Sequence, residues 1–134
     1  MMADALNIGS RRELFVDRAL IEKLDGAGLV LHHPQPQEVA LVCDRPWEKG
    51  GPGYPTVFQD GGLYRMYYRA TPEGARDDED KTQVTCYAES RDGVRWERPE
   101  LGLFEFRGSK QNNIIWQGPI SHNLSPFKDA NPAC

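Results

Sequence analysis

A tight-turn signal near the middle of the chain constrains the fold more than any other feature of the sequence. The tripeptide Asp60-Gly61-Gly62 separates two runs, residues 55–59 and 63–70, that are rich in apolar and aromatic side chains. Glycine accepts the positive φ that tight turns require, and this spacing is typical of a β-hairpin. The sequence therefore predicts two antiparallel strands joined at this turn.

Further short strand-like runs lie on both sides of the hairpin. They are bounded by glycine, proline or polar residues, and they cover residues 29–32, 39–43, 83–90, 101–106 and 112–117. The 13 glycines and 10 prolines of the chain also favour many turns over long helices. Short strands at regular spacing predict an all-β fold, which is an antiparallel sandwich, barrel or propeller.

Two segments depart from the strand pattern. Residues 13–26 fit a short helix, with apolar side chains such as Leu14 and Leu24 and with Gly26 as a stop signal. The first half of this segment fits a strand equally well. Residues 71–81 are almost wholly polar, so they predict a solvated loop between strands.

The bulk properties suit a soluble globular domain and exclude some partners. The chain has 134 residues, of which 39% are apolar and 27% are charged, and its net charge is -4. Non-specific binding to nucleic acid or to an anionic membrane requires a basic field, so we expect neither partner. The start of the chain lacks the apolar run of a signal peptide, and no stretch approaches the roughly 20 apolar residues of a membrane span. The cytoplasm is therefore the default location.

Cysteine and histidine residues give no metal-site pattern. Cys43, Cys86 and Cys134 are widely spaced and form no CxxC pair, so we expect neither a zinc site nor a disulfide framework. Cys43 and Cys86 lie in strand-like runs, where a buried free thiol is the common arrangement. His32-His33 has no acidic partner at metal-ligand spacing. We therefore expect no metal and no cofactor.

A turn motif follows the third strand-like run. In Ser90-Arg91-Asp92-Gly93-Val94-Arg95-Trp96, an Asp-Gly turn is followed three residues later by tryptophan. This spacing puts the aromatic ring back over the hairpin that the turn closes. The motif therefore predicts a structural corner and no chemistry.

These runs together resemble a known family. The segments YPTVFQDGGLYRMYY, TCYAESRDGVRWERPELGLFEF, NNIIW and SPFKDANP look like the opening of a five-bladed β-propeller. They resemble the propeller glycoside hydrolases that cleave furanosides, arabinosides and xylosides, and a related group of uncharacterised bacterial proteins. The resemblance covers residues 13–134.

The resemblance implies a division of the chain. Residues 13–44 would be a leading segment with strands of a neighbouring blade, which would pair with strands from the far end of a longer chain. Residues 54–117 would form the first blade, and residues 121–134 would begin the second. The chain would then be an N-terminal fragment of a longer propeller, because an isolated blade cannot bury both of its faces.

The resemblance also implies catalytic positions. Glycoside hydrolysis requires two opposed carboxyl groups, and the resembled enzymes take acidic residues from the first three blades. The second-blade position falls on Asp129, beside Lys128, and the first-blade position falls on Tyr54, where the resembled enzymes carry Asp. Asp44 and Asp17 are weaker substitutes. The third-blade Glu has no counterpart, so this chain lacks a complete acid–base pair.

Each acidic candidate has a structural alternative. Asp129 fits an Asx turn ahead of a proline, Asp17 fits the cap of the short helix, and Asp44 fits an ion pair with Arg45 or Lys49.

Several other side chains suit contact with a sugar. Trp47, Tyr54 and Trp116 are aromatic residues that could stack on sugar rings, although Trp116 fits core packing better. His122 and Asn123 precede Asp129 and could bind sugar hydroxyl groups, whereas a lone histidine also fits an ordinary loop.

The resulting functional hypothesis is a glycoside-hydrolase-like parent protein whose present fragment is inactive alone. The alternative is a propeller module that binds carbohydrate without turnover, as tyrosine in place of aspartate at position 54 suggests. A truncated chain with no activity of its own is a third possibility. Oligosaccharide or polysaccharide is the expected partner, and exposed sheet edges would also allow self-association of the chain.

Overall fold

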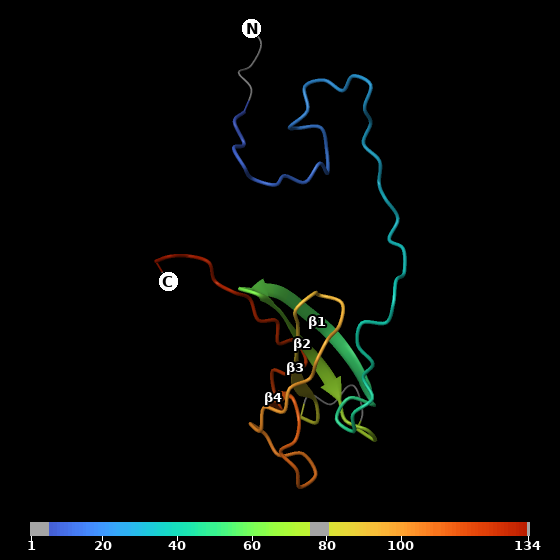
Figure 1. The fold of residues 1–134 in the computed structure, drawn as a ribbon, viewed down its shortest axis with the longest axis vertical. Helices are drawn as coiled ribbons and strands as arrows, with labels where there is room; N and C mark the ends of the chain where they lie inside the picture. Colours follow the sequence, from blue (N-terminus) through green and yellow to red (C-terminus); the bar gives the residue numbers. More distant parts are fainter. Residues whose placement is uncertain (1–5, 76–80, 134) are drawn as a thin grey trace. The chain divides into compact units, whose positions relative to one another are not determined.

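The computed structural model describes residues 6–75 and 81–133, and the chain divides into two units, Met1–Gln37 and Glu38–Cys134. In the described part of the first unit, residues 6–37 form turns and irregular backbone (Figure 1). The helix expected over residues 13–26 is therefore wrong. Its apolar side chains have no core to bury them, since Leu14 is 84% exposed, and short helices depend on such packing for their stability.

The second unit contains one antiparallel sheet of four strands in the order β1-β2-β3-β4 (Figure 1). The strands are β1 (Gly51–Asp60), β2 (Leu63–Thr71), β3 (Val84–Ser90) and β4 (Ile114–Gln117). The all-β fold is thus confirmed for the described residues, as are the hairpin at Asp60-Gly61-Gly62 and the strand predicted for residues 83–90.

Three of the predicted strands do not form as regular strands in the structure. Residues 29–32 and 39–43 form no strand here, and their pairing with a longer chain stays a prediction. Residues 101–106 contribute only an isolated bridge between Phe106 and Ser109. The polar loop expected over residues 71–81 falls partly on residues 76–80, which lie outside the described residues.

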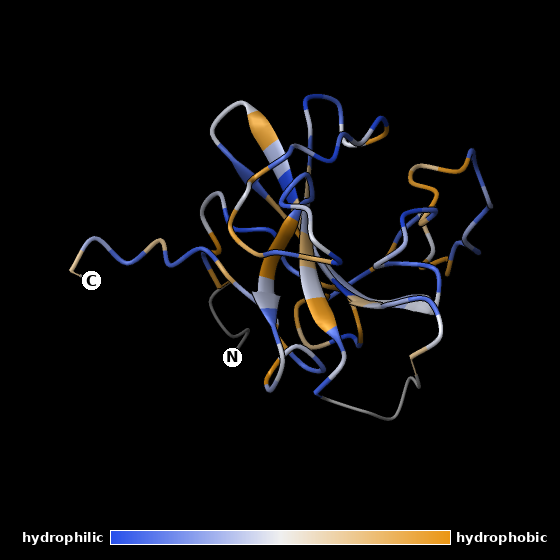
Figure 2. Cartoon of the chain, turned by 90° about the horizontal axis from the view of Figure 1, so that it is seen from below, coloured by the Kyte–Doolittle hydropathy of each residue, from blue (hydrophilic) through white to orange (hydrophobic). Residues whose placement is uncertain are grey.

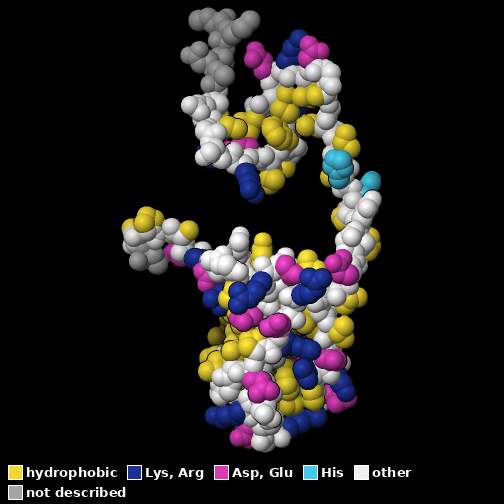
Figure 3. Space-filling view, viewed as in Figure 1, with side chains coloured by type: hydrophobic (Ala, Val, Ile, Leu, Met, Phe, Trp, Pro, Cys, Tyr) yellow, Lys and Arg dark blue, Asp and Glu magenta, His cyan; other side chains and the backbone are white. Residues whose placement is uncertain are grey.

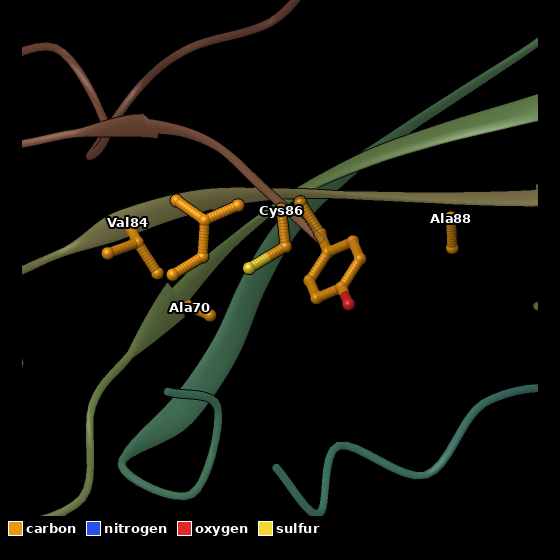
Figure 4. Packing of buried hydrophobic residues seen from close by; sticks show 6 residues of the cluster. Ala70, Val84, Cys86 and Ala88 are labelled. Carbon is orange, nitrogen blue, oxygen red and sulfur yellow. The ribbon is translucent and has the colours of Figure 1, made fainter. Parts of the chain in front are cut away.

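One face of the sheet, here called the inner face, carries the core. It consists of alternate residues of the strands, and they are 0–2% exposed: Tyr68, Ala70, Val84, Cys86, Ala88 and Ile114. Figure 4 shows Ala70, Val84 and Cys86 pointing to the same side of the sheet, and Figure 2 shows hydrophobic and hydrophilic segments alternating along the strands. The small side chains let aromatic residues outside the strands, including Trp47, pack closely on this face.

A buried carboxylate joins the segment before β1 to the sheet. Glu48 is 0% exposed. Its Oε1 accepts a hydrogen bond from the Tyr68 hydroxyl at 2.6 Å, and its Oε2 accepts from Arg98 Nη1 at 2.6 Å and from the Arg45 backbone N–H at 3.1 Å. Three donors and one positive charge therefore replace the water that the carboxylate loses on burial.

Asn113 extends this hydrogen-bond network across the sheet. Its Nδ2 donates to the Tyr68 hydroxyl at 2.8 Å and to the Tyr87 carbonyl at 2.7 Å, while its Oδ1 accepts from Trp47 Nε1 at 2.8 Å. Burial, followed by the charges and hydrogen bonds nearby, raises the pKa of Tyr68 far above its ordinary range. Tyr68 therefore remains a neutral hydroxyl that donates to Glu48.

The corner after β3 matches the predicted structural role of the turn motif. Asp92 Oδ1 accepts from the backbone N–H groups of Val94 and Arg95 at 2.9 and 2.8 Å. Gly93 has a φ of 76°, and its carbonyl accepts from Trp96 Nε1 at 3.2 Å. Trp96 packs against the core, so the predicted corner is confirmed.

The described cysteines are free thiols. Cys86 is buried and Cys43 is half-buried, and burial is the main cause that raises the pKa of both thiols. Both are therefore poorly reactive. Cys134 lies outside the described residues.

Two global features bear on the class of protein. Acidic and basic side chains are interspersed on the face shown in Figure 3, as expected for a weakly charged chain. Among the residues that the structure describes, no helix is long and apolar enough to cross a membrane.

We expect Glu48→Gln to lower the free energy of unfolding by about 3 to 5 kcal/mol, because Arg98 would lose its buried negative partner. Urea denaturation followed by circular dichroism measures this loss. Glu105→Gln is the matched control at an exposed position, and its expected effect is within about 0.5 kcal/mol. Equal stability of the two variants would contradict the role assigned to Glu48.

Candidate functional site

A β-bulge in β1 gives Tyr54 an unusual position. The pairing of β1 with β2 shifts between Gly53 and Thr56, so Tyr54 and Pro55 are the residues at the irregularity. Tyr54 has a φ of 49° and is 58% exposed. Positive φ is uncommon for an aromatic residue, and bulges often redirect a side chain out of the regular alternation. The bulge therefore presents the Tyr54 ring to solvent.

Arg69 of β2 supports the Tyr54 ring from beneath. Arg69 is 9% exposed, and its guanidinium carbon lies 4.8 Å from the centroid of the Tyr54 ring. This is the geometry of a cation–π contact. Arg69 covers one part of the Tyr54 ring, and the rest of the Tyr54 side chain is exposed to solvent.

Histidine and glutamine complete this support. His122 Nδ1 lies 3.1 Å from Arg69 Nη1 and 3.0 Å from Gln83 Oε1, and the His122 ring centroid lies 5.7 Å from that of Tyr54. These contacts join β1, β2, the residue before β3 and the segment after β4. We call Tyr54, Arg69, Gln83 and His122 the Tyr54 cluster.

Gly53 makes room for the guanidinium group. A Cβ atom at position 53 would lie 2.8 Å from Arg69 Nη2, which is closer than a real contact allows. Any larger residue would therefore displace Arg69 from its place beside Tyr54.

An open hollow of about 360 Å³ lies beside the Tyr54 ring. It is lined by Tyr54, Pro55, Thr56, Asn123, Leu124 and Ser125. Thr56 Oγ1 and Ser125 Oγ lie 2.9 Å apart in a hydrogen bond that joins β1 to the C-terminal segment. The lining thus combines an aromatic ring with hydroxyl groups and an amide, and it contains no charged side chain. We call this the Tyr54 hollow.

Lys128 pairs with Asp60 at the turn of the hairpin. Lys128 Nζ lies 2.6 Å from Asp60 Oδ1, and Arg65 Nε donates to Asp60 Oδ2 at 2.8 Å. The hydrogen bond from Lys128, followed by that from Arg65, lowers the pKa of Asp60. Lys128 therefore forms an ion pair with Asp60, which lies 68 residues before it in the chain.

The acidic candidates occupy three different settings. Asp129 Oδ1 accepts from the Asn131 backbone N–H at 2.8 Å, which is the predicted Asx turn. Asp44 accepts from Arg98 Nη2 at 2.9 Å and lies 3.9 Å from Arg45, and the Arg98 hydrogen bond is the main cause that lowers its pKa. Asp17 lies in the first unit and accepts from the Ala19 backbone N–H at 2.8 Å in a turn, not in a helix cap. Their catalytic roles stay predictions.

The two tryptophan candidates differ in exposure. Trp47 is half-buried and belongs to the network around Asn113. Trp116, for which core packing was the better fit, is 42% exposed, so that expectation is wrong. The short β4 lies at the edge of the sheet and leaves its ring uncovered.

The structure therefore brings together three of the predicted site residues, Tyr54, His122 and Asn123, and adds two that the sequence did not indicate, Arg69 and Gln83. Because side chains alternate along β2, Arg69 and Tyr68 point to opposite faces of the sheet. No sequence signal links Arg69 to Tyr54. No group of three histidine, cysteine or acidic side chains suited to a metal ion occurs among the residues that the structure describes.

Comparison with known proteins gives two uncharacterised relatives. No family model matches the chain, and no solved structure matches it. The chain is 41% identical over 56 residues to "Uncharacterized protein Rv1502" and to "Uncharacterized protein MT1551", from two strains of Mycobacterium tuberculosis. The match covers 42% of this chain and 19% of each relative, so the chain spans only a small part of the length of these relatives.

We expect Gly53→Ala to move Arg69 away from Tyr54 while the protein remains folded. The clashing atom is the end of a flexible side chain, so the loss of unfolding free energy should stay below about 1 kcal/mol. Gly50→Ala is the contrasting variant, because its Cβ would lie 2.7 Å from two backbone carbonyl oxygens. It should cost about 1 to 3 kcal/mol.

Gly62→Ala is the control for this pair, since its Cβ would meet nothing within 4 Å. Urea denaturation measures the stabilities, and the NMR shifts of the Tyr54 and His122 rings report the position of Arg69. Unchanged ring shifts in Gly53→Ala would contradict the packing described for Gly53.

Proposed function

We propose that this chain forms a blade of a glycoside-hydrolase-like propeller protein and that its Tyr54 hollow binds a sugar ring. The observation that carries the proposal is the exposed Tyr54 ring, held at a bulge in a positive-φ conformation and supported by the buried Arg69. Backbone strain of this kind costs free energy and is found most often at functional sites.

The chemistry of the hollow matches that of a sugar. A sugar ring has apolar C–H faces that pack on aromatic rings, and its hydroxyl groups both donate and accept hydrogen bonds. Tyr54 offers such a ring, Asn123 offers amide donors and an acceptor, and Thr56 and Ser125 offer hydroxyl groups with capacity left after their mutual bond. A concave site with an aromatic wall and a few polar groups is the usual form of a small-molecule site.

The sheet supports the blade part of the proposal. A propeller blade is a four-stranded antiparallel sheet, and the strands of this chain pair in chain order from β1 to β4. Because 56 matched residues make up 19% of each relative, the relatives are roughly five times as long as the matched segment. That length leaves room for further blades.

Catalysis would require carboxylates in addition to the sugar contacts. Asp129 is the candidate from this chain, and the general acid would come from a later blade of the proposed longer protein. Tyrosine at position 54, where the resembled enzymes carry aspartate, favours sugar binding as the contribution of this blade.

We expect Tyr54→Ala to weaken binding of arabino- and xylo-oligosaccharides at least tenfold, because the stacking surface is lost. Isothermal titration calorimetry on the 134-residue chain measures the affinity. Val57→Ala is the matched control. Val57 is an exposed residue of β1 that pairs regularly with Met66 and lies outside the bulge. Equal affinity of Tyr54→Ala and the unaltered chain would remove Tyr54 from the site.

A second experiment separates hydrolysis from binding alone. In the proposed longer protein, Asp129→Asn should lower the rate of aryl-glycoside hydrolysis about a hundredfold or more if Asp129 is the second-blade carboxylate that stabilises the transition state. The rate of release of the aryl group measures turnover. A full rate in the variant would exclude Asp129, and sugar binding without turnover in the unaltered protein would favour the binding module.

A further inference from the structure

The segment after β4 supplies half of the Tyr54 hollow. Of the six lining residues, 54–56 belong to β1 and 123–125 belong to this segment. The segment then continues to the far end of β1, where Lys128 meets Asp60 (Figure 1). It therefore follows β1 from the bulge to the hairpin turn. We call residues 123–128 the C-terminal strap.

Side chains attach the strap to β1. Thr56 Oγ1 lies 2.9 Å from Ser125 Oγ, and Lys128 Nζ lies 2.6 Å from Asp60 Oδ1. Residues 124–128 are irregular backbone and belong to no strand. The strap is thus held on β1 by two side-chain contacts instead of a ladder of backbone hydrogen bonds.

The two ends of the strap differ in how firmly they are held. At the first end, His122 Nδ1 lies 3.1 Å from Arg69 Nη1 and 3.0 Å from Gln83 Oε1. At the other end, Phe127 is 80% exposed, so burial of its ring does not anchor the strap. The ion pair of Lys128 is therefore the contact that keeps this end beside β1.

This ion pair is accessible to water and salt. The side chains of Lys128 and Asp60 are 53% and 34% exposed. Salt screens exposed pairs of this kind, which shift an equilibrium by at most about fivefold. Arg65 Nε also donates to Asp60 at 2.8 Å, so the carboxylate keeps a cationic partner when Lys128 leaves. The pair can therefore open and close at low cost.

The Tyr54 hollow is itself uncharged, since none of its lining side chains is ionic. Salt therefore has no direct charge to screen when a neutral ligand enters the hollow. Any weakening of neutral-ligand affinity by salt must act through a charged group elsewhere, and the strap connects the hollow to such a group at Lys128.

We propose that the Lys128–Asp60 ion pair is a latch that holds the C-terminal strap against β1 and thereby positions Asn123 and Ser125 in the Tyr54 hollow. The inference rests on the proposed function of that hollow. With the latch closed, the amide and the hydroxyl group face the ligand beside Tyr54. With the latch open, the ligand loses these groups, so salt regulates the affinity of an uncharged site.

The latch is tested first in the 134-residue chain without ligand. Lys128→Glu puts two carboxylates side by side and should open the latch. The backbone ¹⁵N order parameters of residues 124–128 should then fall from about 0.85 to below about 0.6. Lys128→Arg should keep the values of the unaltered chain. Unchanged order parameters in Lys128→Glu would overturn the latch.

Lys110→Glu is the matched control for this test. It makes the same change in net charge at an exposed position that does not line the hollow. It should leave the order parameters of the strap unchanged. An equal loss of order in Lys110→Glu would assign the effect to net charge and overturn the latch.

The effect on the hollow is measured with xylotriose, a neutral probe, by isothermal titration calorimetry. Between about 0.1 M and 1 M NaCl, the affinity of the unaltered chain should fall about two- to fivefold. Lys128→Glu should bind as weakly at low salt as the unaltered chain does at high salt, with no further loss. A salt-independent affinity of the unaltered chain would overturn the proposal.

The two measurements separate this inference from the proposed function. If xylotriose binds with a salt-independent affinity that Lys128→Glu does not change, the proposed function stands and the latch fails. If xylotriose does not bind the unaltered chain, the proposed function fails, and the order parameters alone decide whether the latch exists. A strap that opens in Lys128→Glu without loss of affinity would overturn the link between the latch and the hollow.

Discussion

The buried carboxylate of Glu48 is the interaction on which the rest of the second unit depends. Its partners are Tyr68 from β2, Arg98 from the segment after β3 and the backbone of its own turn. The charge cannot stay buried unless all of these groups are in place. The segment before β1, the sheet and the connection to β4 are therefore held in one arrangement, because each supplies a group that another one requires.

The network and the Tyr54 cluster are linked through adjacent residues of β2. Tyr68 points to the inner face and anchors Glu48, while Arg69 lies on the opposite face and packs beside Tyr54. Successive side chains of a strand alternate between its faces, so the contact that fixes Tyr68 also orients Arg69. The exposed ring of Tyr54 thus lies over a rigid base, and the strained bulge is held by the strand beneath it.

Part of this fold could be predicted from local patterns. The hairpin at Asp60-Gly61-Gly62, the strand ending at Ser90 and the corner at Trp96 follow from turn chemistry and period-2 alternation, which act over a few residues. The helix over residues 13–26 was wrong because its apolar pattern needs a partner surface, and the local pattern does not reveal that its side chains, such as Leu14, stay exposed among the described residues. The expected core packing of Trp116 was wrong for a related reason, because the burial of this side chain depends on which residues pack beyond β4.

The sequence by itself determined the all-β class, the turns and three candidate site residues that the structure brings together, namely Tyr54, His122 and Asn123. It determined them because side-chain type and short-range spacing limit the backbone conformations that are available. Only the tertiary structure decided that Arg69 and Gln83 join these residues and that Lys128 pairs with Asp60. Each of these contacts joins segments far apart in the chain, and the geometry of such contacts exists only once the sheet has formed.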